Sequence, residues 1–193
     1  MLRPVASARH QVRTFDSFVD RSFDALRGHP AVDRLFYAAS ELGDFSLIWL
    51  LLGGVRALRS DRDLQAAKRL TLGLAVESFA VNAVIKSVFR RTRPPWEAHR
   101  PRHLRQPRTS SFPSGHATAA CVATILLSED DPLWPLYCAV GVVVASSRVY
   151  VKIHHASDVL AGVVVGVALG VAGRRLMPLP PPPEDGDDRP ELS

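Results

Sequence analysis

The chain alternates between long apolar segments and shorter segments rich in charged residues. The apolar segments are residues 42–58, 70–89, 117–127, 133–151 and 159–172. The first is marginal in length and contains Asp44 near its start, with Trp49 further along. Segments of this kind are typical of helices that cross a lipid bilayer. The pattern therefore predicts an all-α, integral-membrane helical bundle with about five spanning helices.

The first 41 residues follow a different pattern. Apolar residues recur at the period of a helix, with charged residues between them: Phe15, Phe18, Val19, Phe23 and Leu26. This spacing predicts an amphipathic helix that is too charged to span a bilayer. A second short apolar stripe, residues 31–39, follows a break at Gly28 and Pro30. We expect both helices to lie at the membrane interface or to pack on the bundle, and a soluble amphipathic cap is the alternative.

Three regions result: an amphipathic N-terminal helical region at 1–41, a membrane-embedded core at 42–177, and a disordered, proline-rich acidic tail at 178–193. Inside the core, residues 90–112 form a long polar connection with seven arginines and four prolines, which we interpret as a lid or entrance. Near the end of the core, Gly162, Gly166 and Gly170 recur at every fourth position. This spacing predicts one helix face that packs closely on a neighbour.

Charge and cysteine content narrow the class of protein. The 193 residues carry a net charge of +5, which suits nucleic acid, an anionic membrane surface or an anionic substrate. The arginines sit mainly between the apolar segments, with neither zinc-ligand spacing nor an RNA-binding aromatic motif, so we expect no nucleic-acid partner. Cys121 and Cys138 lie inside apolar segments and are interpreted as small buried hydrophobic residues rather than a disulfide.

Polar clusters stand at the ends of several apolar segments. Their members are Lys86 and Arg93, then Ser114, Gly115 and His116, and then Arg148, His154 and Asp158. If each apolar segment crosses the membrane once, all of these ends lie on one face. The sequence therefore predicts a single site that combines three fixed cations with two histidines and a carboxylate, as metal-free phosphate chemistry requires.

These residues carry a resemblance to a known family. The spacing Lys, six residues, Arg-Pro is present at 86–94, Pro-Ser-Gly-His at 113–116, and Ser-Arg, five residues, His, three residues, Asp at 147–158. In this the chain resembles the type 2 phosphatidic acid phosphatase superfamily, with every fixed position matched. The resemblance covers roughly residues 42–172. Integral-membrane members commonly have six spanning helices, whereas here the N-terminal region is expected to be interfacial.

The chemistry of the residues and the resemblance assign the same roles. Lys86, Arg93 and Arg148 would neutralise the phosphate oxygens, and Ser114 and Gly115 would add donors at a helix N-terminus. His154 would attack phosphorus to form a phosphohistidine, and Asp158, one helical turn later, would orient its ring. His116 would protonate the leaving oxygen and then activate water. No metal or other cofactor is required.

Several other polar residues receive structural assignments. Glu77 is separated from Lys86 by nine residues, which predicts opposite helix faces and favours a structural hydrogen bond over a direct role. His155 is interpreted as a structural or rim residue, and Trp96 and Trp134 as interfacial anchors. The remaining basic residues are expected to face solvent or lipid headgroups: Arg90, Arg91, Arg100, Arg102, Arg105, Arg108 and Lys152.

The sequence thus predicts a multi-pass cell-membrane phosphatase that acts on a lipid phosphate monoester or pyrophosphate, with the bilayer and a phosphorylated lipid as its partners. One alternative is a membrane module that binds or transports phosphorylated lipid without catalysis. Another is a vanadate-dependent halide oxidation, which larger soluble members of the superfamily perform. Residues 1–13 lack the apolar core of a signal peptide, so we expect insertion to depend on the later segments. The distribution of arginine favours a cytoplasmic active site.

Overall fold

The computed structural model describes residues 3–95, 104 and 109–181, with side chains described from residue 7 onward. Every regular element in these residues is helical, so the prediction of an all-α fold is confirmed. The elements are α1 (Arg3–Asp24), α2 (Pro30–Leu42), η1 (Asp44–Ser46), α3 (Leu47–Ala57), α4 (Asp61–Phe79), the π-helical segment η2 (Ala80–Ile85), α5 (Lys86–Val88), α6 (Gly115–Leu127), α7 (Trp134–Tyr150) and α8 (Ala156–Leu176).

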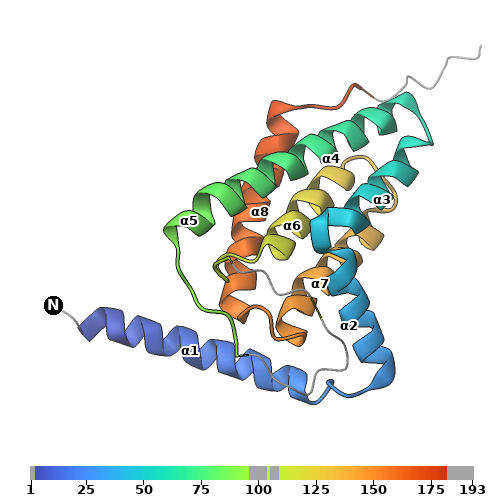
Figure 1. The fold of residues 1–193 in the computed structure, drawn as a ribbon. Coiled ribbons are helices and arrows are strands. Elements are labelled where there is room, and N and C mark those ends of the chain that lie inside the picture. The colour runs from blue at the N-terminus through green and yellow to red at the C-terminus, as the bar shows by residue number, and fades with distance from the viewer. Residues whose placement is uncertain (1–2, 96–103, 105–108, 182–193) are drawn as a thin grey trace, which may run out of the picture.

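Helix α6 lies at the centre of the bundle, between α4, α7 and α8 (Figure 1). It packs closely on α8 because α8 has glycines at the contact, where there is no room for a side chain. A Cβ atom on Gly162 would lie 2.6 Å from the carbonyl oxygen of Ser114, and one on Gly166 would lie 2.5 Å from that of Thr118. The predicted glycine face is therefore confirmed, and it packs on α6.

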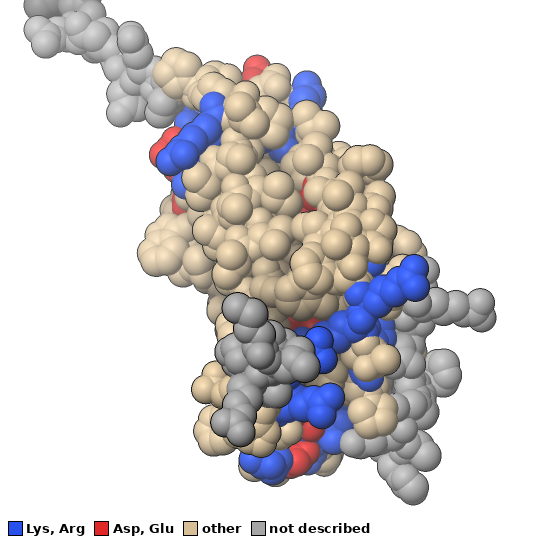
Figure 2. All heavy atoms as spheres, turned by 90° about the vertical axis from the view of Figure 1, so that its left-hand side faces the viewer, with Lys and Arg blue, Asp and Glu red and all other residues tan. Residues whose placement is uncertain are grey.

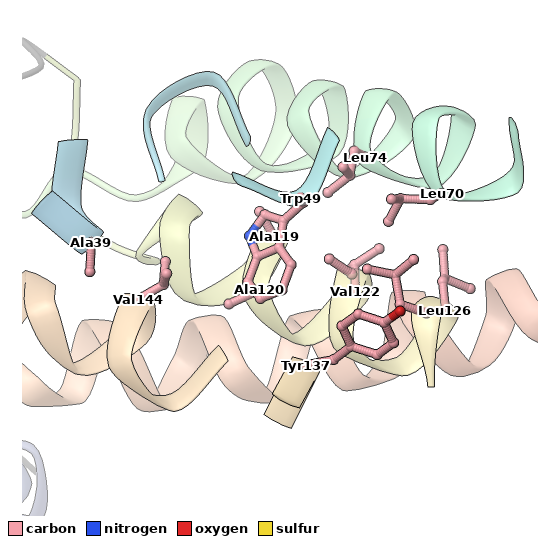
Figure 3. Close-up of a cluster of buried hydrophobic side chains, with 12 residues drawn as sticks. Ala39, Trp49, Leu70, Leu74, Ala119, Ala120, Val122, Leu126, Tyr137 and Val144 are labelled. Carbon is pink, nitrogen blue, oxygen red and sulfur yellow. The ribbon is translucent and has the colours of Figure 1, made fainter. Parts of the chain in front are cut away.

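The apolar core surrounds α6. Trp49 from α3, Leu70 and Leu74 from α4, and Tyr137 from α7 are buried against the alanines, the single valine and the leucines of α6 (Figure 3). Such burial removes apolar area from water or lipid headgroups and holds the four helices in register. The N-terminal end of α6 is thereby fixed relative to the ends of its neighbours.

Apolar side chains also cover the outer surface of the bundle. Large residues with more than half of their surface exposed include Leu51, Val55, Leu72, Val142 and Val164. Figure 2 shows an uncharged band between two charged ends of the molecule. An exposed apolar band of this kind fits a surface in contact with lipid tails.

The helices differ in their capacity to cross a bilayer. By length and composition, α8 and the continuous helix Asp61–Val88 are long and apolar enough, and α2 with η1 and α3 forms a third candidate that is bent by 75°. All five predicted segments contain helix, but the first is not one straight span. The break lies at η1, where Phe45 and Ser46 adopt positive φ angles of 54° and 58°.

The N-terminal amphipathic segment is helical as its periodicity predicts. Helix α1 contacts α7 and α8 at one end of the bundle (Figure 1). Phe23 anchors it, with its ring edge-on to Phe36 of α2 and Tyr150 of α7 at centroid distances of 6.1 Å and 5.9 Å. Phe18 on the same helix is exposed.

Candidate active site

The three predicted clusters meet at one end of the bundle. There a cavity of about 330 Å³ is bounded by six of the eight predicted site residues, namely Lys86, Arg93, Gly115, His116, Arg148 and His154. Lys86 begins α5, Arg93 follows it in the connection, and Gly115 begins α6. Arg148 lies near the end of α7, and His154 lies in the turn before α8. Ser114 and Asp158 are buried and are not part of the lining.

His154 is buried, and each ring nitrogen has a defined neighbour. Nε2 lies 3.0 Å from Nη1 of Arg93, and Nδ1 lies 3.7 Å from Oδ2 of Asp158. A guanidinium can only donate, so Nε2 must accept and the ring proton of neutral His154 belongs on Nδ1, facing Asp158. Burial lowers the pKa of His154 to about 3; Arg148 and Arg93 act in the same direction and Asp158 opposes them. Nε2 of His154 therefore carries its lone pair on the side of the cavity.

Asp158 is positioned by groups that the sequence analysis did not identify. Nη1 of Arg91 donates to Oδ1 of Asp158 at 2.6 Å, and the backbone N–H of His155 donates to Oδ2 at 2.9 Å. Nη2 of Arg91 donates to Oδ2 of Asp16 at 2.6 Å. The prediction that Arg91 faces solvent or headgroups is therefore wrong. No short-range spacing indicates these contacts, because Asp16, Arg91 and Asp158 lie far apart in sequence.

Asp16 brings α1 into the same network. Its Oδ1 accepts the backbone N–H of Ser157 at 2.8 Å, and its Oδ2 accepts the hydroxyl of Ser157 at 2.9 Å. Ser157 lies in the first turn of α8, where backbone N–H groups need acceptors and a carboxylate is stabilising. The amphipathic helix therefore contacts the residue next to Asp158.

The opposite side of the cavity is formed by the junction of α2 and α3. Nε2 of His116 lies 3.1 Å from the carbonyl oxygen of Ser40 and 3.3 Å from Oδ1 of Asp44. Arg148 donates a hydrogen bond to the hydroxyl of Ser40. A Cβ atom at Gly43 would lie 2.5 Å from Cδ2 of His116, so only glycine fits beside this ring. The sequence analysis did not identify any of these three partners.

Lys86 lies over the N-terminus of α6. Its Nζ donates to Oδ1 of Asn82 at 2.9 Å, and a Cβ atom on Gly115 would lie 3.6 Å from Nζ. The first N–H groups of a helix have no partner within the helix and point toward anions. Ser114 is fully buried; its N–H donates to the carbonyl oxygen of Asp158 at 3.0 Å and its hydroxyl has no hydrogen-bond partner in the described structure. Ser114 does not line the cavity, so the structure does not support the predicted role of its hydroxyl at the phosphate.

Glu77 lines the same cavity as Lys86, so the prediction of opposite helix faces is wrong. The reason is the π-helical segment Ala80–Ile85 between them. A π-helical turn takes up about one more residue than an α-helical turn, which shifts the phase by roughly 100°. The predicted structural hydrogen bond is absent too, since Oε1 of Glu77 is buried without a partner in the described part of the chain.

The other polar residues that received structural assignments lie at the margin of the site. His155 is the N-cap of α8, which agrees with a structural role. Arg90 is exposed, and Lys152 lies 3.8 Å from a carboxylate oxygen of Asp20. Trp134 is exposed at the start of α7. Trp96, Arg100, Arg102, Arg105 and Arg108 lie outside the described residues.

Comparison with known proteins identifies the family. Residues 66–179 match the family model of the PAP2 superfamily. A decaprenylphosphoryl-5-phosphoribose phosphatase of Mycobacterium tuberculosis is 31% identical over 147 residues, which is 76% of this chain and 81% of the relative. The protein of that name from Mycolicibacterium smegmatis is 34% identical over 141 residues, 72% of this chain and 75% of the relative.

A solved structure shares the fold. The transmembrane PAP2-type phosphatidylglycerolphosphate phosphatase from Bacillus subtilis aligns with a TM-score of 0.65 at 22% identity, over 91% of this chain and 96% of the other. The chain belongs to the PAP2 superfamily. It is an integral-membrane helical bundle and a metal-independent lipid phosphatase, so the non-catalytic alternative is set aside.

Proposed function

We propose that the protein hydrolyses a lipid phosphate monoester or pyrophosphate in the cell membrane through a phosphohistidine at His154. The observation that carries this proposal is the orientation of the His154 ring. Nε2 is directed to Arg93 and the cavity, while Nδ1 faces Asp158. A nucleophilic nitrogen with an orienting carboxylate behind it is the arrangement that covalent phosphate transfer requires.

The substrate phosphate would occupy the cavity between His154 and His116. Lys86, Arg93 and Arg148 line this space and would neutralise the phosphate oxygens. The N-terminus of α6, which begins at Gly115, would add backbone donors. Charge neutralisation by these fixed groups stabilises the charge that develops on the transferred phosphoryl group.

In the first step, Nε2 of His154 would attack phosphorus, and a P–N bond would form as the P–O bond to the leaving group breaks. The electron pair goes to the leaving oxygen, which takes a proton from His116. Asp44 lies 3.3 Å from Nε2 of His116 and would stabilise the protonated ring. Asp158 would stabilise the positive charge that His154 acquires.

In the second step, water would attack phosphorus from the side that the leaving group has vacated. His116 would take the proton of this water, and the electron pair of the P–N bond would return to His154. Inorganic phosphate is then released, and both histidines have regained their starting protonation states. The two steps thus use His116 first as an acid and then as a base.

The position of the cavity suggests how a lipid reaches it. Its wall includes Phe45 and Ser46 of the η1 break and Glu77 and Ser78 of α4. Phe45 and Phe79, which flank this side, are both largely exposed on the apolar surface of the bundle. We infer that the lipid chain remains in the bilayer and that its phosphate enters between η1 and α4, with α1 lying on the membrane surface at the same end.

The relatives suggest a first substrate. Two of them are named for decaprenylphosphoryl-5-phosphoribose, so a prenyl-linked phosphosugar should be tested before other lipids. The test is phosphate release by the purified protein in detergent with chelator present, on that lipid, phosphatidate, phosphatidylglycerol phosphate and a polyprenyl pyrophosphate. Chelator-resistant release that is lost in His154→Ala supports the proposal. No release from any of the four lipids would contradict it.

A further inference from the structure

Glu77 is a buried carboxyl group that the catalytic steps above do not use. It is 3% exposed, lies near the C-terminal end of α4, and its Oε1 has no hydrogen-bond partner in the described structure. A carboxyl group buried at membrane depth without a partner is costly. A ligand that supplies the missing hydrogen-bond donors would lower this cost.

The buried stripe along α4 and the start of η2 shows where Glu77 points. Leu70, Leu74, Glu77 and Val81 are all buried and recur at intervals of four, three and four residues. Leu70 and Leu74 pack in the core around α6 (Figure 3). Glu77 continues this apolar stripe at the level where the core gives way to the cavity, whose lining it joins.

The reaction geometry identifies which part of a substrate lies there. Displacement at phosphorus is in line, so the leaving group projects from the phosphate on the side of His116, away from His154. Besides the histidines and the cations, the lining of the cavity includes Gly43 and Ser46, Ala119 one turn into α6, and Glu77 and Ser78. Because the three cations are assigned to the phosphate, the leaving group is expected against this remaining part of the lining, which includes Glu77.

We propose that Glu77 forms a subsite that accepts hydrogen bonds from hydroxyl groups of the leaving group next to the scissile phosphate. A carboxyl group at this position favours a polyhydroxylated leaving group, such as the sugar of a lipid-linked phosphosugar, because hydroxyls supply the missing donors. A leaving group that is itself a phosphate, as in a pyrophosphate, has no hydroxyl groups next to the scissile phosphate to donate to Glu77. This inference rests on the proposed phosphatase function and selects the substrate class within it.

The competing interpretation is that Glu77 only holds Lys86 in place, since both line one cavity. The two interpretations differ in a measurable way. Loss of a hydroxyl subsite weakens turnover only of substrates that carry the hydroxyls, whereas displacement of Lys86 weakens binding of every phosphate. Inhibition by inorganic phosphate or orthovanadate reports on the phosphate site alone.

The test uses the full-length protein with Glu77→Leu and Glu77→Gln. Leucine extends the buried Leu70–Leu74 stripe, so we expect this variant to fold and its apparent Tm to be unchanged or higher. Glutamine keeps one acceptor oxygen and loses the second. Glu41→Gln is the matched control, because Glu41 is exposed and lies outside the cavity lining.

The substrates are a prenyl-linked phosphoribose, its analogue without ring hydroxyls, and a polyprenyl pyrophosphate. For Glu77→Leu we expect kcat/KM on the phosphoribose lipid to fall about 5- to 30-fold, the effect of leaving substrate hydroxyl groups without their acceptor. Turnover of the hydroxyl-free analogue and of the pyrophosphate should change less than about threefold, and Glu77→Gln should be intermediate on the phosphoribose lipid.

Two results would overturn the subsite. One is an equal loss of kcat/KM on the phosphoribose lipid and on its hydroxyl-free analogue, together with weaker inhibition by orthovanadate. The other is an equal kcat/KM of the parent protein on the two lipids. This comparison requires no variant. Either result leaves the phosphatase proposal intact, whereas absence of phosphate release from all substrates would contradict the phosphatase proposal itself.

Discussion

The guanidinium of Arg91 is joined to the carboxylate of Asp158 by a hydrogen bond of 2.6 Å, and this contact fixes the carboxylate that faces His154. Arg91 is held in turn by Asp16 of α1. The ring of the proposed nucleophile is thus supported through two layers of charged groups. Such supporting contacts commonly set how well a catalytic side chain is oriented.

Removal of Arg91 should therefore slow catalysis more than it weakens binding. For Arg91→Ala we expect kcat to fall roughly 10- to 100-fold with a smaller change in KM, because Asp158 loses its positioning partner. Arg91→Lys should recover part of the rate, since a lysine supplies the charge but not the fork of donors. Steady-state kinetics on the preferred lipid measures both parameters.

The control for Arg91 is its neighbour Arg90, which is exposed. Arg90→Ala should alter kcat less than about twofold, in line with a surface substitution. If Arg91→Ala and Arg90→Ala behave alike, Arg91 does not position Asp158 for catalysis.

The phosphohistidine can be trapped. With a ³²P-labelled lipid phosphate and a rapid alkaline quench, the parent protein should retain label that acid removes, as expected for a P–N bond. His154→Ala should retain none. His116→Ala should accumulate label with a soluble ester whose leaving group needs no proton, because hydrolysis of the intermediate lacks its base. Label that survives in His154→Ala would assign the nucleophile to another residue.

We expect the ring of His154 to stay neutral in mildly acidic solution. Its pKa is lowered to about 3, so the folded protein holds the neutral ring where a free histidine is already charged. With ¹⁵N-labelled histidine in detergent, the signal that is missing in His154→Asn should keep the shifts of a neutral ring, protonated on Nδ1, down to about pH 5. A midpoint near pH 6.5 would contradict this.

The same shift has a consequence for stability. Protonation favours the unfolded chain, because His154 binds a proton there at about pH 6.5 and in the fold only near pH 3. The contribution of buried neutral His154 is therefore complete above about pH 6.5 and decreases as the pH falls toward 3. His154→Asn should accordingly lose less apparent Tm between pH 7 and pH 5 than the parent does.

The close contact of α8 with α6 predicts a stability difference between two glycines. In Gly166→Ala the new Cβ would lie 2.5 Å from the carbonyl oxygen of Thr118, so we expect a loss of about 1–3 kcal/mol. In Gly54→Ala on α3 nothing lies within 4 Å, and better helix propensity should stabilise the protein by up to about 1 kcal/mol. Thermal unfolding followed by circular dichroism compares the two. Equal melting temperatures would show that α8 does not pack at this distance.

The sequence by itself determined the class of fold and indicated six of the residues that line the cavity. Uninterrupted apolar segments have few alternatives to membrane helices, because backbone polar groups in lipid must be satisfied within the segment. The distance from His154 to Asp158 is one helical turn, so their proximity is a local property of the chain. The order of the segments also predicts that Lys86, His116 and Arg148 lie at one end of the bundle.

Tertiary structure alone decided which further residues reach the site. Asp16 and Arg91 lie 75 positions apart, and their contact depends on how α1 packs across the end of the bundle. Gly43 and His116 meet because α2 and α3 bend at η1, and Glu77 turns toward Lys86 because η2 departs from α-helical phase. These are outcomes of packing between distant segments, in which local propensity is overridden. Periodicity describes one helix at a time, so it could not predict them.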